Sequence, residues 1–417
     1  MRRIFVLGTN QVNFIYLLAK SIKALDAGIA FSSLSFNFGR AKPPDDLNTV
    51  FDPIYPRAFN PVCFLVSIVR SLGQAIFWRI LLFILFVEFK PAKAVFFWYQ
   101  WNMERSFFLK ENLSDVSIYQ FHYMQYSYIR PVWFVSKKAK VVCTFWGSDL
   151  LRTSDPLNHF IVQKALERAD AITTQSEELR EIVLAKFGRS LRPKVRILKL
   201  TLDTAIVDKI DELKGLDRSE ILVKLGLPEA RVVILAGHNA SPFNNHKAIL
   251  EAVNSLKPEV KKDVLVVIPF AYGSGELQMT DYRKGLEELI RKSPVSVRFL
   301  NHHLADEQVA MLRIAVDIMV HIPDSDALSG AATECMYAGN VLITGSWLPY
   351  GPFRRAGLFY KECDSPGDLR EVMNAAIENL DDEKRKSSEN REQVRAHFFP
   401  EKTAAQWISM FYDLVPS

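Results

Sequence analysis

The stretch VRFLNHHLADEQVAMLRIAVDIMVHIPDSDALSGAATECMYAGNVLIT, from Val297 to Thr344, decides the fold class of this 417-residue chain. Three short apolar runs predict buried strands, as in a parallel sheet covered on both faces: Val297–Leu300, Asp317–Ile322 and Val341–Thr344. Between these runs, two segments predict helices: Asp306–Ala315 with acids in its first turn, and Ser329–Gly339 with a capping serine and a closing glycine. Alternating strands and helices predict an α/β fold with a parallel sheet.

A polar turn begins at Pro323, at the carboxyl end of the second strand, where open α/β sheets bind ligands. Ser329 and Gly330 then open a helix whose free N–H groups and positive end favour a phosphate. Asp326 and Glu334 flank this helix start, and each carboxylate can accept two hydrogen bonds from hydroxyl groups of a ribose or a sugar. A capped helix with one solvated acid is the other interpretation of the same residues.

Asp326 and Glu334, with the Cys-Met-Tyr-Ala-Gly that follows, resemble the E-x7-E signature of retaining GT-B glycosyltransferases of the family 4 type. The clear resemblance extends from Val232 to Thr344. It implies an α/β, GT-B fold in which two Rossmann-like domains face each other across a cleft. It also implies a hexosyltransferase-like enzyme that moves a sugar from a nucleotide-diphosphate sugar to an acceptor with retention of configuration. No cofactor and no metal are expected, and Asp326 is a candidate catalytic residue.

Composition and charge bound the function further. Half of the residues are hydrophobic (49%), and four cysteines without paired spacing argue against a zinc site or a disulfide framework. Residues 1–200 carry a net charge of +12, from 27 basic and 15 acidic side chains, whereas residues 201–417 carry −7. A basic first half predicts an acidic partner, such as an anionic lipid or a pyrophosphate-linked acceptor. No nucleic-acid-binding motif is present, so nucleic acid is not expected as a partner.

Two strand ends in the first half carry candidate residues. Gly8 follows the predicted strand Arg3–Leu7, and in GT-B enzymes this first loop lies near the cleft, which makes Gly8 a candidate on the acceptor side. His122 follows the predicted strand Ser117–Phe121 and resembles the family's strand-end histidine close to the transferred sugar, so it is a candidate catalytic residue. A purely structural histidine is the alternative.

The turn Trp146-Gly147-Ser148-Asp149 resembles the "W-G-x-D" turn of GT-B transferases, including the fucosamine transferases of enterobacterial common antigen. Asp149 either touches the acceptor or organises its own loop through an Asx turn.

Donor-binding candidates gather at the start of the second half. Gly237, His238 and Asn239 follow the predicted strand Val232–Ala236, and the family resemblance implies that this loop contacts the donor diphosphate. Lys247 then opens a helix and is a candidate for both donor binding and catalysis, with a solvated helix lysine as the alternative. A further group of candidates completes the predicted donor site: Tyr272, Ser329, Gly330 and Glu334.

The most apolar stretch, Val62–Phe89, has two interpretations. It predicts either a buried helix pair or an interfacial surface in which Phe77, Trp78, Phe83 and Phe86 enter lipid beside basic residues. Ala94–Tyr99 predicts a strand, and Ala41–Pro61 predicts a loop. No uninterrupted apolar run reaches the roughly 20 residues of a membrane span, so we expect a cytoplasmic protein that contacts the inner membrane surface peripherally.

The predicted domain organisation has four parts: an acceptor-binding domain at 1–200, a linker at 201–229, a nucleotide-sugar-binding domain at 230–395, and a helix at 396–417 that packs back on the first domain. Bacterial surface polysaccharide or glycoconjugate synthesis is the expected pathway, with a saccharide or lipid-linked saccharide acceptor. Two other functions stay open. Asp324 and Asp326 spell the D-x-D of a metal-dependent GT-A transferase, and the chain could also be a non-catalytic nucleotide-sugar-binding protein.

Overall fold

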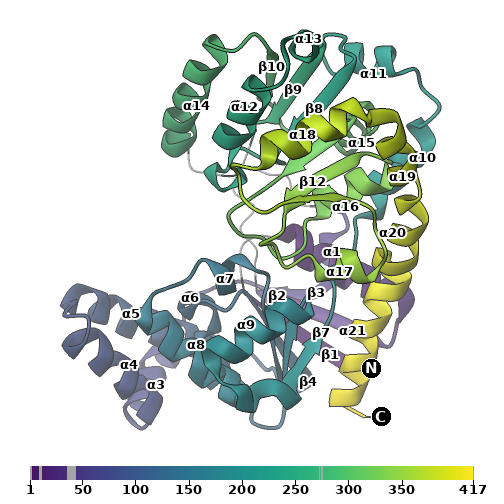
Figure 1. The fold of residues 1–417 in the computed structure, drawn as a ribbon. Helices are drawn as coiled ribbons and strands as arrows, with labels where there is room; N and C mark the ends of the chain where they lie inside the picture. Colours follow the sequence, from purple (N-terminus) through teal and green to yellow (C-terminus); the bar gives the residue numbers. More distant parts are fainter. Residues whose placement is uncertain (1, 9–11, 35–43, 272, 274–275, 417) are drawn as a thin grey trace. The chain divides into compact units, whose positions relative to one another are not determined.

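The computed structural model describes residues 2–8, 12–34, 44–271, 273 and 276–416. The chain forms two compact units (Figure 1). Unit 1 comprises Met1–Thr201 and Pro400–Ser417, and unit 2 comprises Leu202–Phe399. Each unit is built on one parallel sheet with helices packed against it, so the α/β class predicted from the alternating pattern is confirmed.

The sheet of unit 1 has seven strands in the order β3-β2-β1-β4-β5-β6-β7. Their bounds are β1 (Arg2–Leu7), β2 (Ile29–Leu34), β3 (Phe51–Tyr55), β4 (Val116–His122), β5 (Lys140–Thr144), β6 (Ala171–Thr174) and β7 (Val195–Ile197). The chain builds outward from β1 to one side and from β4 to the other. The strand order therefore reverses between β1 and β4, and such a switch point creates a crevice at the carboxyl ends of the strands.

Helices cover this sheet and extend beyond it. Their bounds are α1 (Val12–Leu25), α2 (Leu47–Val50), α3 (Pro61–Leu72), α4 (Ala75–Phe86), α5 (Pro91–Lys110), α6 (Tyr126–Ile129), α7 (Ser148–Leu151), α8 (Pro156–Arg168), α9 (Glu177–Phe187) and α21 (Pro400–Leu414). Figure 1 shows α21 beside β1, and its Trp407 and Phe411 are buried in one cluster with Ile15 and Leu18 of α1. The last helix of the chain thus completes the core of the first unit.

The sheet of unit 2 has six strands in the order β10-β9-β8-β11-β12-β13. Their bounds are β8 (Val232–Ala236), β9 (Val264–Pro269), β10 (Ser296–Leu300), β11 (Ile318–His321), β12 (Val341–Gly345) and β13 (Lys361–Cys363). β8, β9, β11 and β12 are wholly buried because helices lie on both faces, which explains their near-continuous apolar sequences. Here the strand order reverses between β8 and β11.

The helices of unit 2 begin within the segment predicted as a linker. α10 (Thr204–Leu213) and α11 (Arg218–Lys224) bury Val207, Ile210, Ile221 and Leu222 in the core of this unit. The remaining helices are α12 (His246–Asn254), α13 (Pro258–Lys261), α14 (Glu276–Arg291), α15 (Asp306–Ala315), α16 (Gly330–Tyr337), α17 (Gly351–Arg355), α18 (Leu369–Glu378), α19 (Leu380–Ser388) and α20 (Asn390–Phe398).

Two predictions of local structure were wrong. Ala94–Tyr99 lies inside helix α5 and not in a strand, because Pro91 starts a helix whose Phe97 and Trp101 pack inward. The segment predicted as a loop contains β3, in which Pro53 is tolerated because β3 is an edge strand.

The interfacial interpretation of the apolar stretch was wrong for Phe77, which is only 1% exposed. No single helix in the described ranges is both long enough and apolar enough to cross a membrane. Together α3 and α4 reach that length and composition, but they are bent from each other by 84°.

Candidate functional site

The switch point of unit 2 brings together residues from two loops that are far apart in sequence. β8 and β11 are neighbours, with Ala236 opposite Val320. His238 follows β8 and His321 ends β11, so their rings meet at 5.2 Å between centroids. His321 Nδ1 is buried and has no hydrogen-bond partner in the described part of the chain. A buried nitrogen without a partner is the kind of group that a bound ligand or water satisfies.

Asp326 lies directly beside these histidines. Its Oδ2 accepts hydrogen bonds from His321 Nε2 (3.2 Å) and the Tyr350 hydroxyl (2.7 Å), and its Oδ1 accepts one from the N–H of Ala327 (2.9 Å). Burial alone would raise the pKa of this carboxyl, but the hydrogen bonds and charge of the surroundings outweigh it and lower the pKa to about 2. Asp326 is therefore an ionised carboxylate with a fixed orientation.

Helix α16 starts with open space around its first residue. Ser329 Oγ accepts the N–H of Ala332 at 3.2 Å and caps the helix, as its residue type predicts. A Cβ added to Gly330 would meet no atom within 4 Å. The start of the helix therefore has room for a group larger than a hydrogen atom next to the N–H groups of the first turn, which α-helix geometry leaves without a partner inside the helix.

Glu334, the second acid of the signature, is held by an arginine that was not among the predicted site residues. Arg313 of α15 donates two hydrogen bonds, from Nε (3.1 Å) and NH2 (3.0 Å), both to Oε2 of Glu334. Both side chains are less than a tenth exposed, and burial raises the pKa of Glu334 against the charge of Arg313. Oε1 of Glu334 accepts no hydrogen bond within the described residues and remains available as an acceptor.

The loop after β8 is tied to the loop after β11. Gly237 has a φ of +64°, and a Cβ there would lie 2.9 Å from the Asn244 side chain, so glycine is required. Asn239 accepts hydrogen bonds from the Ser241 N–H and the Asn244 amide. Asn245, itself at a φ of +56°, donates to Ile322 O (2.9 Å) and Asp324 Oδ1 (2.8 Å). These bonds fix the two loops against each other.

Lys247 stands apart from this network in the first turn of α12. Its side chain is 69% exposed, and its ammonium group lies 3.9 Å from Glu251. The structure therefore does not bring Lys247 into contact with His238 or Asp326. Tyr272, the remaining predicted donor residue, lies outside the described residues.

Unit 1 places Gly8 and His122 together at its own switch point. Gly8 has a φ of +142°, and a Cβ there would come within 2.3 Å of the His122 carbonyl oxygen. The His122 ring is buried and stacks on Trp146, whose Nε1–H donates to His122 Nδ1 at 3.0 Å. Burial lowers the pKa of His122 to about 3. A neutral ring that accepts at Nδ1 carries its proton on Nε2, so His122 can donate a hydrogen bond but cannot act as a base.

Asp149 organises the loop that follows β5. Its carboxylate accepts backbone N–H bonds from Met124 (2.8 Å), Trp146 (2.9 Å) and Gly147 (2.9 Å). Burial still raises the pKa of Asp149 to about 6. These bonds correspond to the loop-organising interpretation of Asp149, and through Trp146 they also position His122.

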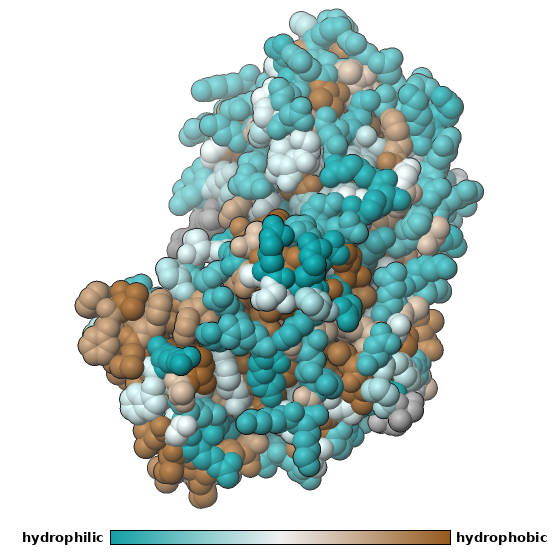
Figure 2. Space-filling model, turned by 60° about the horizontal axis from the view of Figure 1, so that its bottom comes forward, coloured by the Kyte–Doolittle hydropathy of each residue, from teal (hydrophilic) through white to brown (hydrophobic). Residues whose placement is uncertain are grey.

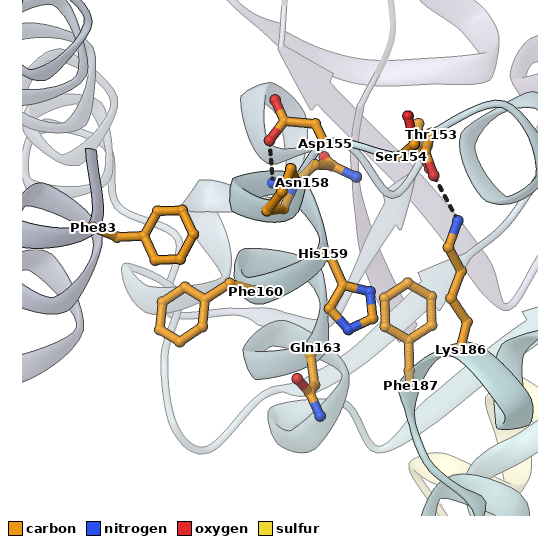
Figure 3. A pocket seen from close by; sticks show the side chains of 11 residues that line it. Phe83, Thr153, Ser154, Asp155, Asn158, His159, Phe160, Gln163, Lys186 and Phe187 are labelled. Carbon is orange, nitrogen blue, oxygen red and sulfur yellow. Dashed lines mark hydrogen bonds between the residues drawn. The ribbon is translucent and has the colours of Figure 1, made fainter. Parts of the chain in front are cut away.

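A pocket of about 430 Å³ opens nearby in unit 1, between α4, α8, α9 and the loop after α7 (Figure 3). Phe83 of α4 stacks on Phe160 of α8 at one end, with ring centroids 5.7 Å apart. At the other end, Lys186 donates to the carbonyl of Thr153, and His159 lies against Phe187. The size lies within the range of small-molecule sites.

The buried histidines predict an acid-sensitive fold. Burial lowers the pKa of His122 and His238 to about 3 and that of His246 to about 4. Because unfolded histidines take up protons near pH 6.5, the stabilisation from these neutral rings is full above that pH and is lost as the pH falls. Each histidine should remove about 2 kcal/mol of unfolding free energy between pH 7 and pH 5, partly offset by Asp149, whose raised pKa acts in the opposite direction.

Urea titrations at the two pH values measure this dependence. The variant His238→Asn should show a smaller difference in unfolding free energy between the two pH values. Equal stability of the wild type at pH 7 and pH 5 would contradict the prediction.

Sequence reasoning missed three residues of the unit 2 site: Arg313, His321 and Tyr350. A signal existed for two of them, since Arg313 stands among apolar residues of a helix and His321 ends an otherwise apolar strand. Tyr350 lies in an irregular loop, where the sequence has no periodicity that indicates which side chain is buried.

Comparison with solved structures identifies the fold. HepE from Anabaena, in complex with UDP and glucose, is similar over 99% of both chains, with a TM-score of 0.68 and 14% identity. Sucrose-phosphate synthase from Thermosynechococcus elongatus (99% of both chains, TM-score 0.68, 12% identity) and a glycosyltransferase from Rickettsia africae (100% and 99%, TM-score 0.69, 12% identity) are similar as well. No protein-family model and no curated protein matches the sequence.

These similarities span both units of the chain. They establish the GT-B fold with two Rossmann-like domains, as the sequence predicts. The resemblance to family 4 and to the fucosamine transferases stays a prediction.

Proposed function

We propose that this protein is a glycosyltransferase that moves a sugar from a nucleotide-diphosphate sugar to an acceptor, with retention of configuration. The observation that carries the proposal is the unit 2 switch point, where Asp326 and Glu334 flank the open start of α16. Support comes from HepE, which shares the fold over its whole length and was crystallised with UDP and with UDP-glucose.

The donor would bind to unit 2. Oε1 of Glu334 would accept a hydrogen bond from the ribose, and the N–H groups at the start of α16 would hold the diphosphate. Asp326, kept ionised by its partners, would accept hydrogen bonds from hydroxyl groups of the sugar. The flexible side chain of Lys247 would place its charge on the diphosphate as the glycosidic bond breaks.

The acceptor would bind to unit 1. There the neutral His122 offers its Nε2–H as a hydrogen-bond donor, and the pocket beside Phe83 and Lys186 offers space for part of the acceptor. Retention without a covalent intermediate agrees with the absence, among the described residues, of a carboxylate free of protein partners at either switch point. A role in bacterial surface polysaccharide synthesis remains part of this proposal.

Calorimetric titration of the full chain with nucleoside diphosphates tests the donor site, followed by transfer and hydrolysis assays with labelled nucleotide-sugars. We expect one nucleoside diphosphate to bind clearly more tightly than its monophosphate, and its sugar to be turned over. Binding without turnover for any acceptor or water would favour a non-catalytic nucleotide-sugar-binding protein. The absence of binding would refute the proposal.

Chelation distinguishes this mechanism from a metal-dependent one. Asp324 accepts a hydrogen bond from Asn245, and both oxygens of Asp326 are engaged, so neither carboxylate is set out as an open ligand. We expect chelator-treated enzyme to keep most of its activity, because Lys247 and the start of α16 carry the positive charge. Activity that chelation abolishes and Mn²⁺ or Mg²⁺ restores would instead favour the D-x-D interpretation.

A further inference from the structure

The helices α3, α4 and α5, together with the turns beside them, form a lobe at residues 56–110 whose outer surface is apolar. Fourteen of the 19 large hydrophobic side chains that are exposed in the described chain lie between residues 59 and 99, about a tenth of the sequence. Figure 2 shows hydrophobic surface gathered at the lower left, over this lobe. Such a concentration marks an interaction site, since soluble chains rarely expose a large continuous apolar patch.

Helix α3 is amphipathic, but unlike an ordinary surface helix it buries polar side chains and exposes apolar ones. Its buried residues are Ser67 and Ser71, and both hydroxyls donate to Asn102 Oδ1 of α5, at 2.9 and 3.0 Å. Apart from Arg70, its exposed residues are apolar, with Leu65 63% exposed and Val69 71% exposed. A helix that turns its serines toward the protein and its leucine and valines away is built for apolar surroundings outside the chain.

The apolar face continues along α4 and into the next turn. Trp78, Leu82 and Phe86 recur every four residues on the outward face of α4, and Phe86 is 66% exposed. Phe89 follows and is 77% exposed. Its φ of +54° is an unusual backbone conformation for a bulky residue. The opposite face of α4 carries Phe77 and packs against α5.

The net charge of the lobe is positive. Residues 56–110, all within a described range, hold seven Lys or Arg and two acids. Glu88 is paired with Lys93 and Glu104 with Arg130. Arg57, Arg70, Arg79 and Lys90 are exposed. An apolar face bordered by cations complements an anionic bilayer, with side chains in the acyl boundary and cations at the headgroups. Two copies of this chain meeting through the lobe would instead bring like charges together.

We propose that the lobe at residues 56–110 docks the protein on the surface of an anionic lipid bilayer. The inference rests on α3–α5 alone and does not depend on the proposed glycosyl transfer. One bilayer surface can contact the outward faces of α3 and α4 and the neighbouring cations at the same time.

Flotation of the full chain with vesicles tests the proposal. Neutral phosphatidylcholine vesicles and vesicles with added phosphatidylglycerol are each used at low and at high salt. We expect binding that requires the anionic lipid and falls as salt rises.

Arg70→Gln or Arg79→Gln should each weaken vesicle binding about fivefold. Phe86→Ser or Phe89→Ser should each weaken it about tenfold or more. Both phenylalanines are exposed, so these variants should fold, which circular dichroism checks.

Val223→Ser and Arg189→Gln serve as controls, because they change a 76% exposed valine of α11 and a 74% exposed arginine side chain outside the lobe. Both should bind like the wild type. Four results would overturn the proposal. The first three are no flotation under any condition, equal loss in lobe and control variants, and an oligomer in light scattering that Phe86→Ser dissociates. The fourth is resistance to carbonate extraction, which would favour insertion over surface docking.

Discussion

Replacing Glu334 by alanine is expected to lower the free energy of unfolding by about 3–5 kcal/mol, because it leaves the buried Arg313 without its carboxylate. Arg313 is only 7% exposed, so water solvates its charge poorly in the folded chain. Urea denaturation followed by circular dichroism measures the loss. Stability equal to that of the wild type would contradict a buried ion pair.

The double variant Arg313→Met, Glu334→Leu separates this structural role from donor binding. An apolar pair in place of the buried charges should recover most of the lost stability. Binding of the nucleoside diphosphate should nevertheless remain at least tenfold weaker, since a hydrogen bond to the carboxylate is worth about 1.5–3 kcal/mol. Wild-type affinity in the stable double variant would remove Glu334 from the donor site.

Lys247→Ala is expected to lower turnover about 100- to 1,000-fold while the affinity for the intact donor changes only a few-fold. An interaction with charge that develops as the bond breaks acts mainly on the rate. Lys247 is 69% exposed and has one distant ion-pair partner, so its removal should hardly affect stability. Single-turnover kinetics and calorimetry give the two quantities.

Lys284→Ala is the matched control. Its side chain is also 69% exposed and also forms one ion pair within its helix, with Asp281 at 3.5 Å. Turnover should be unaffected in this variant. If Lys247→Ala turns over donor as fast as Lys284→Ala, Lys247 has no part in catalysis.

The strands that carry the candidate site could be predicted because burial on both faces leaves long apolar runs that end in polar turns. Val232–Ala236 matches its predicted bounds for this reason. The prediction of a strand at Ala94–Tyr99 was wrong because aromatic and β-branched residues, which are typical of strands, form this part of a helix. Pro91 was the local signal for a helix start, and packing against α3 and α4 stabilises the helix that follows it.

The sequence predicted where the residues of the candidate site lie, but not which of them contact each other. Strand ends gave Gly8, His122, His238 and Asp326, since parallel strands deliver their carboxyl ends to one edge of the sheet. The partner of Glu334 could not be inferred, because Arg313 lies 21 residues earlier in the sequence and only the packing of α15 against α16 brings the two together.

The position of α21 has a consequence for synthesis on the ribosome. Ala404, Trp407 and Phe411 are fully buried in unit 1, and Trp407 donates to the carbonyl of Lys199. While the ribosome translates unit 2, the α1 side of unit 1 therefore lacks part of its apolar cover. Unit 2, whose chain is continuous, can fold as it emerges, whereas unit 1 lacks α21 until residues 400–414 have been made. The half made first is thus the half completed last, and a nascent chain stalled before residue 400 would expose that surface to chaperones.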